Sequence, residues 1–188
     1  MVARKTDAVV QKGSTDGPKF GLHHSWLDKV ELDLPNAELL RTAEERQWSF
    51  GDVEANGVYY HPRFLHYAHQ AFEIWFEKRF GLSYADLSRA EPDARARRME
   101  KLGNEAASPF TLAPGALYAE LYSPMRASDR YRLWPTMQRI GERRVVVVVL
   151  LFGISPLAPA GYVAWLRWAR LVGKPGTIAM PSAFGRAP

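Results

Sequence analysis

The sequence predicts an α+β fold in which one long helix lies across one face of an antiparallel β-sheet. Residues 62–80 place apolar side chains at helical spacing, and the chain after residue 108 changes to apolar stretches separated by Ser, Asp, Pro and Gly. Little helix is expected between those later stretches, so consecutive strands should run antiparallel. One helix packed on such a sheet buries the apolar stripe of the helix and one face of the sheet together.

The chain begins with an expected extension at residues 1–43, followed by a main domain at 44–188. Residues 1–20 are polar and rich in Gly, Lys, Asp and Thr, which is typical of a mobile tail. The rest of the extension holds enough apolar residues for a short packed segment. Residues 44–50 alternate in polarity and predict a first strand, and the turn-rich residues 51–60 predict a loop before the helix.

The long helix has clear start and stop signals. Pro62 suits the first helical position, and Gly81 suits the position just past the end. Lys78 and Arg79 stand in the last turn, where the helix dipole favours cations. The span corresponds to about 28 Å of helix. The apolar stripe expected to bury it consists of Phe64, Leu65, Ala68, Ala71, Phe72, Trp75, Phe76 and Phe80.

The remainder of the chain predicts a charged connection and then a sheet of five to six strands. Residues 83–108 are expected to be partly helical, with their charges facing solvent. The run Val145–Val149 is too apolar for a strand with one wet face, so we expect it at the centre of the sheet, between the helix and a second subunit. The later strands are predicted at Leu117–Met125, Tyr131–Ile140, Arg144–Phe152, Tyr162–Val172 and Thr177–Met180.

The segment Val145–Leu166 has a membrane helix as its alternative interpretation. It contains 22 residues without a charge, which is long enough to cross a bilayer. We interpret it as two strands, because its first part is β-branched and Gly and Pro interrupt its middle. Residues 1–13 lack the apolar core of a signal peptide.

The composition fits one domain with a core and excludes several chemistries. The 188 residues are 47% apolar, carry a formal net charge of +5 and include no Cys. A disulfide framework, a thiolate zinc site and a cysteine nucleophile are therefore excluded. The modest positive charge permits an anionic partner without predicting nucleic acid. His61, His66 and His69 lack the HExxH spacing, so no metal site is predicted.

The stretch Trp48–Gly81, WSFGDVEANGVYYHPRFLHYAHQAFEIWFEKRFG, resembles the signature of the 4-hydroxybenzoyl-CoA thioesterase family. The shared elements are a strand, an acidic loop, Gly with small apolar residues, a Tyr-His pair and the helix. The stretch RIGERRVVVVV at 139–149 is similar to the turn and central strand of that family. The resemblance covers residues 44–182 and implies the hotdog fold, in which a curved antiparallel sheet wraps a central helix.

The same resemblance implies an activity. It is the hydrolysis of an acyl or aryl thioester of coenzyme A, or of an acyl carrier protein, to a free acid and a thiol. The resemblance also implies a homodimer or homotetramer with the pocket between paired sheets. We expect a cytoplasmic enzyme with no cofactor, no nucleic-acid partner and no membrane association.

Glu54 stands where the family carries its catalytic Asp, and Asp52 matches the acidic position that often precedes it. Taken as residues alone, Glu54 is equally a surface residue of a loop, and Asp52 is equally a turn former. His69 stands in the second helical turn, where many members carry Glu. A separate branch of aryl-CoA thioesterases takes its carboxylate from the central helix, which keeps Glu73 as an alternative.

Thioester hydrolysis needs a carboxylate that attacks the carbonyl carbon or activates water, and a donor for the developing oxyanion. Glu54, with Asp52 as the alternative, is the expected carboxylate. The start of the helix offers unpaired N–H groups and a positive dipole end. The N–H of His61 or of Gly57 is the expected oxyanion donor, and the His61 side chain is a further candidate catalyst. Gly57 would also let a substrate approach the backbone closely.

The binding residues are expected in two groups. Arg143 and Arg144 flank the turn before the Val run, and arginine forks match the phosphate oxygens of CoA. Their alternative role is a solubilising turn. The aromatic residues expected at an acyl pocket, or alternatively in the core, are Tyr59, Tyr60, Phe64 and Trp75.

Two rival functions use the same fold. A non-catalytic acyl-thioester-binding or structural protein is motivated by the Glu at position 54 in place of Asp. A hydratase or dehydratase ranks lower, because no Asp and His are paired at a spacing suited to proton transfer across a double bond.

Overall fold

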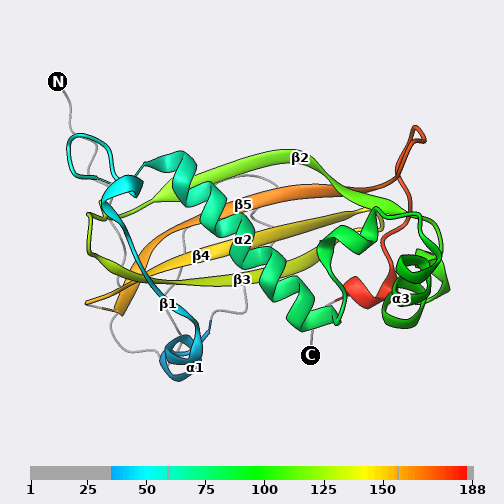
Figure 1. Cartoon of the computed structure of the whole chain (residues 1–188), viewed down its shortest axis with the longest axis horizontal. Coiled ribbons are helices and arrows are strands. Elements are labelled where there is room, and N and C mark those ends of the chain that lie inside the picture. The colour runs from blue at the N-terminus through cyan, green and yellow to red at the C-terminus, as the bar shows by residue number, and fades with distance from the viewer. Residues whose placement is uncertain (1–34, 59, 156, 186–188) are drawn as a thin grey trace.

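The computed structural model describes residues 35–58, 60–155 and 157–185 and confirms the α+β class. One long helix, α2, lies across one face of a five-stranded sheet (Figure 1). The strands are β1 Glu45–Gln47, β2 Phe110–Leu121, β3 Arg130–Ile140, β4 Arg144–Ile154 and β5 Leu157–Leu171. The helices are α1 Ala37–Thr42, α2 His61–Phe80 and α3 Pro92–Leu102, with 3-10 turns η1 Phe50–Asp52, η2 Tyr84–Leu87, η3 Asn104–Ala106 and η4 Ser182–Phe184.

The sheet is antiparallel throughout, in the order β1-β3-β4-β5-β2. β4 lies at its centre, as predicted from Val145–Val149, and these five side chains are buried. The uncharged segment Val145–Leu166 is divided between β4 and β5, which confirms the interpretation as two strands. Across the described ranges, no helix combines the length and apolar character that a membrane span requires. β2 forms one edge of the sheet, and no other described strand pairs with its outer side.

α2 begins one residue before the predicted start and ends at the predicted residue. Gly81 adopts the left-handed conformation, with φ 62°, and its N–H donates to the Glu77 carbonyl at 2.8 Å. Figure 1 shows the helix crossing the sheet diagonally, from the side of β2 at its start toward β3 at its end. Burying a Phe contributes about 1.5–3 kcal/mol, so tertiary packing is the main source of stability for α2. Its fully buried positions are Phe64, Ala68, Phe72 and Phe76.

The two faces of β4 belong to two separate apolar clusters. Val145 and Val147 face α2 and the main core. Val146 and Val148 face the opposite side, where they pack in a cluster with Leu40 of α1. The side chains of this second cluster are at most 2% exposed. No second subunit is needed to bury them, contrary to the expectation from the sequence.

β1 is shorter than the predicted strand at 44–50. The chain leaves the ladder at Trp48, whose N–H donates to the Asp129 carbonyl at 3.0 Å. The Trp48 ring is buried and stacks on Tyr131, with ring centroids 4.6 Å apart. Because this anchor ends the strand, the following residues turn through η1 toward α2.

Three later strand predictions also differ from the structure. β5 begins at Leu157, before the predicted start at Tyr162. β2 begins at Phe110, before the predicted start, because a bulge between Pro114 and Ala116 lets proline and glycine fit in an edge strand. Residues 177–180 form no strand. Ile178 donates to the Ala169 carbonyl at 2.9 Å and Met180 donates to the Glu142 carbonyl at 2.6 Å, which fixes the segment without a ladder.

The charged connection is partly helical, as predicted, but its charges do not all face solvent. Arg98 of α3 is completely buried. Its Nε donates to the Ala106 carbonyl at 3.1 Å, and its Nη1 donates to the carbonyls of Asp86 at 2.7 Å and Arg89 at 2.5 Å. Its Nη2 donates to the Ala107 carbonyl at 3.3 Å. The side chain therefore joins α3 to the ends of η2 and η3.

Candidate active site

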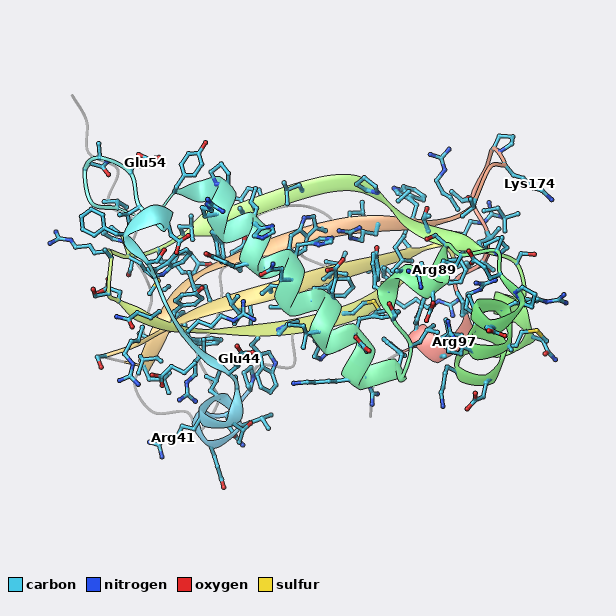
Figure 2. The ribbon with its side chains drawn as sticks, viewed as in Figure 1. Arg41, Glu44, Glu54, Arg89, Arg97 and Lys174 are labelled. Atoms are coloured by element: carbon cyan, nitrogen blue, oxygen red, sulfur yellow. The ribbon has the colours of Figure 1, made fainter. Side chains whose placement is uncertain are left out.

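Glu54 lies in an exposed tight turn just ahead of α2. Its N–H donates to the Val58 carbonyl at 2.7 Å, and the Gly57 N–H donates to the Glu54 carbonyl at 2.8 Å. Gly57 has a φ of 78°, which glycine adopts without strain. Figure 2 shows Glu54 at the tip of this loop, at the end of the molecule where α2 begins. The Gly57 N–H is used within the turn, which leaves the His61 N–H as the expected oxyanion donor.

Asp52 is a buried carboxylate that fastens the loop to α2. Its Oδ2 accepts from the Ser49 N–H at 2.9 Å and from the Ser49 hydroxyl at 2.6 Å. Its Oδ1 accepts from the Tyr67 hydroxyl at 2.7 Å and lies 3.9 Å from Arg63 Nε. The Asp52 carbonyl also accepts from the Tyr60 N–H, at 2.6 Å. These bonds hold both ends of the loop that carries Glu54.

The hydrogen bonds set the charge state of Asp52. Burial by itself raises the pKa of this carboxyl, but the bonds from Ser49 and Tyr67 and the charge of Arg63 outweigh it and hold the pKa below the ordinary 3.8. Asp52 is therefore ionised at neutral pH, with donors on both oxygens. By contrast, the Glu54 side chain makes no hydrogen bond with any described residue.

The start of α2 supplies the electrophilic side of the site. Tyr60 is the N-cap residue and caps no N–H with its side chain. His61 is the first helical residue, so its N–H has no acceptor within the helix, and Pro62 has no N–H. The side chain of His61, predicted as a catalyst, and all of Tyr59 lie outside the described residues.

The remaining aromatic candidates separate into surface and core. Tyr60 is 46% exposed, and Phe50 in the adjacent η1 is 88% exposed. Phe64 is buried in the main core, and Trp75 is packed partly buried against that core. The segment that leads into α2 therefore carries exposed aromatic side chains, which suit contact with an apolar group or a second protein surface.

Arg143 and Arg144 lie far from Glu54 within one chain. They flank the β3–β4 turn at the end of β3. Glu54 lies near the start of β3, because Val58 in its loop forms a bridge with Arg126, just before that strand. At about 3.3 Å per residue, β3 separates the two places by roughly 30 Å. A single chain does not bring these arginines to the carboxylate.

The other polar residues of α2 lie on its surface flank. His66 is exposed, and its Nε2 lies 3.1 Å from Gln70 Nε2. The Nδ1 of His69 lies 3.6 Å from Glu73 Oε1, and both side chains are partly exposed. Among the described residues, no three His, Asp or Glu side chains are placed to hold a metal ion.

A second polar cluster, consisting of His69, Tyr84, Trp165 and Arg167, was not found from the sequence. Arg167 of β5 is only 7% exposed, and its Nη1 donates to the Tyr84 hydroxyl at 3.1 Å and to the Leu112 carbonyl at 3.0 Å. The His69 ring lies edge-on to the rings of Tyr84 and Trp165, with centroid distances of 6.3 and 6.2 Å. The sequence does contain a signal for this cluster. Arg167 stands two residues after Trp165 in an apolar strand, so both side chains point to the inward face of the sheet.

The fold and the loop together define an α+β protein of the hotdog class, with a carboxylate presented at the start of its central helix. The chain is similar to a 1,4-dihydroxy-2-naphthoyl-CoA thioesterase from Synechocystis, with a TM-score of 0.56 and 17% identity over 75% of this chain and 90% of that one. For a gentisyl-coenzyme A thioesterase the TM-score is 0.54 and the identity 10%, over 75% and 97% of the two chains. A Staphylococcus aureus protein in complex with CoA gives 0.55 and 11%, over 76% and 77%.

These similarities confirm the hotdog fold predicted from residues 44–182. They do not single out the 4-hydroxybenzoyl-CoA thioesterase family among proteins of this fold. No protein-family model and no curated protein sequence matches the chain.

Proposed function

We propose that the chain hydrolyses an acyl or aryl thioester of coenzyme A, or of an acyl carrier protein, to a free acid and a thiol. One observation carries this proposal. Glu54 is an exposed carboxylate on a loop that Asp52 fastens to the start of α2, where the His61 N–H has no acceptor within the helix. Two of the similar structures are CoA thioesterases and a third holds CoA, which supports a CoA thioester as the substrate.

Glu54 acts as the nucleophile or as the general base. As nucleophile, its carboxylate oxygen bonds to the thioester carbon, the C–S bond breaks, and water then hydrolyses the resulting anhydride. As base, it takes a proton from a water molecule that attacks the same carbon, and the proton passes to the leaving thiolate. The His61 N–H, at the positive end of the α2 dipole, stabilises the oxyanion. Asp52 keeps the loop in place and takes no proton.

The outer side of β2, which pairs with no other described strand, suggests where a second copy binds. β2 is an edge strand of 12 residues, and its Leu117 side chain is 52% exposed. Two copies that pair β2 with β2 about a two-fold axis would place the Glu54 end of one beside the opposite end of the other. Arg143 and Arg144 of the second copy would then reach the CoA phosphates, which they do not reach within one chain. We therefore propose that the chain forms a homodimer or a homotetramer.

The resemblance of residues 48–81 to the 4-hydroxybenzoyl-CoA thioesterase family supports a thioester substrate with either an alkyl or an aryl acyl group. The test is release of free thiol from a panel of aryl- and alkyl-CoA thioesters by the full chain. Glu54→Gln should lower kcat by about 10²–10⁴-fold, because the amide neither attacks nor accepts a proton. The matched control Glu100→Gln changes an exposed glutamate of α3 and should keep the wild-type rate.

A non-catalytic thioester-binding protein is the second candidate. The observation that favours it is the exposed Glu54, which is one methylene longer than the Asp of the family signature. Wild-type protein that binds a CoA thioester without releasing thiol from any member of the panel would establish this function and overturn the hydrolase. Unchanged turnover in Glu54→Gln would overturn the assigned carboxylate.

A further inference from the structure

Arg167 is a buried cation whose donors are only partly used. Its side chain faces α2 from β5 and is more than nine-tenths buried. Its Nη1 donates to the Tyr84 hydroxyl and to the Leu112 carbonyl, and its guanidinium lies 5.8 Å from the Trp165 ring centroid. The buried Nε–H has no hydrogen-bond partner among the described residues, and none of their carboxylates forms a salt bridge with this guanidinium. A buried charge without a counter-charge is costly, so an anion at this position would be stabilised strongly.

Arg132 shows that this situation is particular to Arg167. The Nε of Arg132 is also buried without a partner. However, Arg132 Nη2 lies 3.1 Å from the Glu45 carboxylate, and its Nη1 donates to the Leu40 carbonyl at 2.7 Å. Its charge is therefore paired within the chain. Arg167 has a neutral hydroxyl and a carbonyl as its only described acceptors.

Tyr84 adds a second donor beside Arg167. Its hydroxyl oxygen accepts from Arg167, so its hydrogen remains for another acceptor, and no acceptor for it is found among the described residues. Burial raises the pKa of Tyr84, so the hydroxyl stays protonated. An Arg N–H and a Tyr O–H beside one another form a fork suited to the two oxygens of a carboxylate.

The position of this cluster along α2 matches the length of an acyl group. His69 lies eight residues after His61, which corresponds to about 12 Å along the helix axis. The His69 side chain is 39% exposed and lies against Tyr84 and Trp165, so the cluster borders solvent on the flank of α2. Burial lowers the pKa of His69, which keeps the ring neutral beside Glu73. An acyl group with its carbonyl at His61 would have to extend about this far along α2 to reach Arg167.

We propose that Arg167 and Tyr84 bind a carboxylate at the far end of the acyl group, so that the preferred substrate is the mono-thioester of a dicarboxylic acid. Trp165 covers the apolar part of the acyl group. This inference rests on the proposed thioester hydrolysis for its orientation, since the carbonyl is assigned to the start of α2. The recognition itself depends only on the residues around Arg167.

The test compares suberyl-CoA, whose chain ends in a carboxylate, with octanoyl-CoA, which has the same length and ends in a methyl group. Both are measured as substrates, and their non-hydrolysable thioether analogues are measured by equilibrium titration. The full chain should favour the carboxylate-ended compound by about 10-fold or more in kcat/KM and in binding, as expected for a buried charge-assisted hydrogen bond. Arg167→Met should abolish the preference, and Arg167→Lys should keep part of it.

Two further variants separate recognition from folding. Tyr84→Phe removes one hydroxyl and should reduce the preference for the carboxylate-ended compound severalfold. Arg170→Met, an exposed arginine on the same strand, should leave the preference intact. Equal binding of the two analogues by wild type, a preference that survives in Arg167→Met, or a stronger preference for a hydroxyaryl-CoA would overturn the proposal. Carboxylate-selective binding without any hydrolysis would instead reject the proposed activity and keep this site.

Discussion

Arg98 in α3 and Arg167 in β5 are both buried, but their surroundings differ in what they leave unused. Arg98 donates to four backbone carbonyls, and its charge lies among oxygens that the chain itself supplies. Arg167 donates to one carbonyl and one hydroxyl and keeps a buried N–H without a described acceptor. The difference indicates that a guanidinium bound by four backbone carbonyls stabilises the fold, whereas one that leaves a buried N–H without an acceptor is suited to a ligand.

The region around Arg98 has the features of a structural joint. The side chain of Asp86 receives two hydrogen bonds from Arg97, at 3.1 and 2.9 Å, and one from Arg89, at 3.4 Å. The backbone carbonyl of Asp86 accepts a hydrogen bond from Nη1 of Arg98. Figure 2 shows Arg89 and Arg97 at the end of the molecule opposite Glu54. Within one chain the joint is therefore remote from Glu54. It also anchors η2, which carries Tyr84, so changes to it should lower stability more than they lower turnover.

The largest effect is expected for Arg98→Met. This change leaves several buried carbonyls without a donor, and the free energy of unfolding should fall by about 3 kcal/mol or more. Urea unfolding followed by circular dichroism measures it. The exposed Arg95→Met, on the same helix, is the control and should change stability little. A loss for Arg98→Met as small as that of the control would contradict the structural role.

Asp86→Asn should have the next largest effect. The amide cannot accept two charge-assisted bonds from Arg97, but both arginine partners are about half exposed, so solvent screening limits the loss. We expect a decrease of about 1–2 kcal/mol in the free energy of unfolding, by the same urea measurement. Thiol release by this variant should fall far less than in Glu54→Gln, and a loss as large as that of Glu54→Gln would place the joint in the active site.

Low pH should decrease the free energy of unfolding through two buried carboxylates, Asp52 and Asp86. Hydrogen bonds from Arg97 lower the pKa of Asp86 below 3.8, and those of Ser49 and Tyr67 overcome burial to lower that of Asp52. For a carboxyl with a lowered folded pKa, the stabilisation is fully present above the unfolded value and is lost as the pH falls through the folded value. Unfolding free energy should therefore fall below about pH 4. Asp52→Asn and Asp86→Asn should each flatten this dependence, and an unchanged slope in both would contradict the assignment.

The smallest change in stability is expected for Arg167→Met. Replacing a partly unsatisfied buried charge by an apolar side chain of similar length is often neutral or stabilising. The free energy of unfolding should change by less than about 1 kcal/mol, in contrast to Arg98→Met. Thermal and urea unfolding of Arg167→Met and Arg98→Met under the same conditions measure this difference in unfolding free energy. Equal losses in both would show that Arg167 also serves the fold.

The features that follow from nearby residues were predictable from the sequence. α2 was found because Pro62, Gly81 and the apolar stripe are local signals, and β4 was found because Val145–Val149 has no polar side chain. The burial of Arg98 was not predictable, because its acceptors lie in two 3-10 turns on either side of α3 that meet only in the folded chain. Edge strand β2 was misplaced because its proline and glycine are tolerated only through a bulge.

The candidate site was predictable to a similar degree. Glu54 is predicted through the resemblance of residues 48–81, since its exposed position in a turn carries no physical signal of its own. The anchoring role of Asp52 depends on a hydrogen bond from Tyr67, which lies in α2. The loop residues alone therefore do not predict this role. Alternation along β5 places Arg167 inward, but Tyr84 reaches it from a distant part of the chain.

The proposed hydrolysis requires that a thioester carbonyl binds at the start of α2 with Glu54 facing its carbon. A crystal structure of the full chain with the non-hydrolysable suberyl-CoA analogue tests it most directly. We predict a Glu54 carboxylate oxygen within about 3.5 Å of the carbon that replaces the thioester carbonyl, with the far carboxylate on Arg167. An analogue bound with Glu54 in solvent, away from that carbon, would contradict the account.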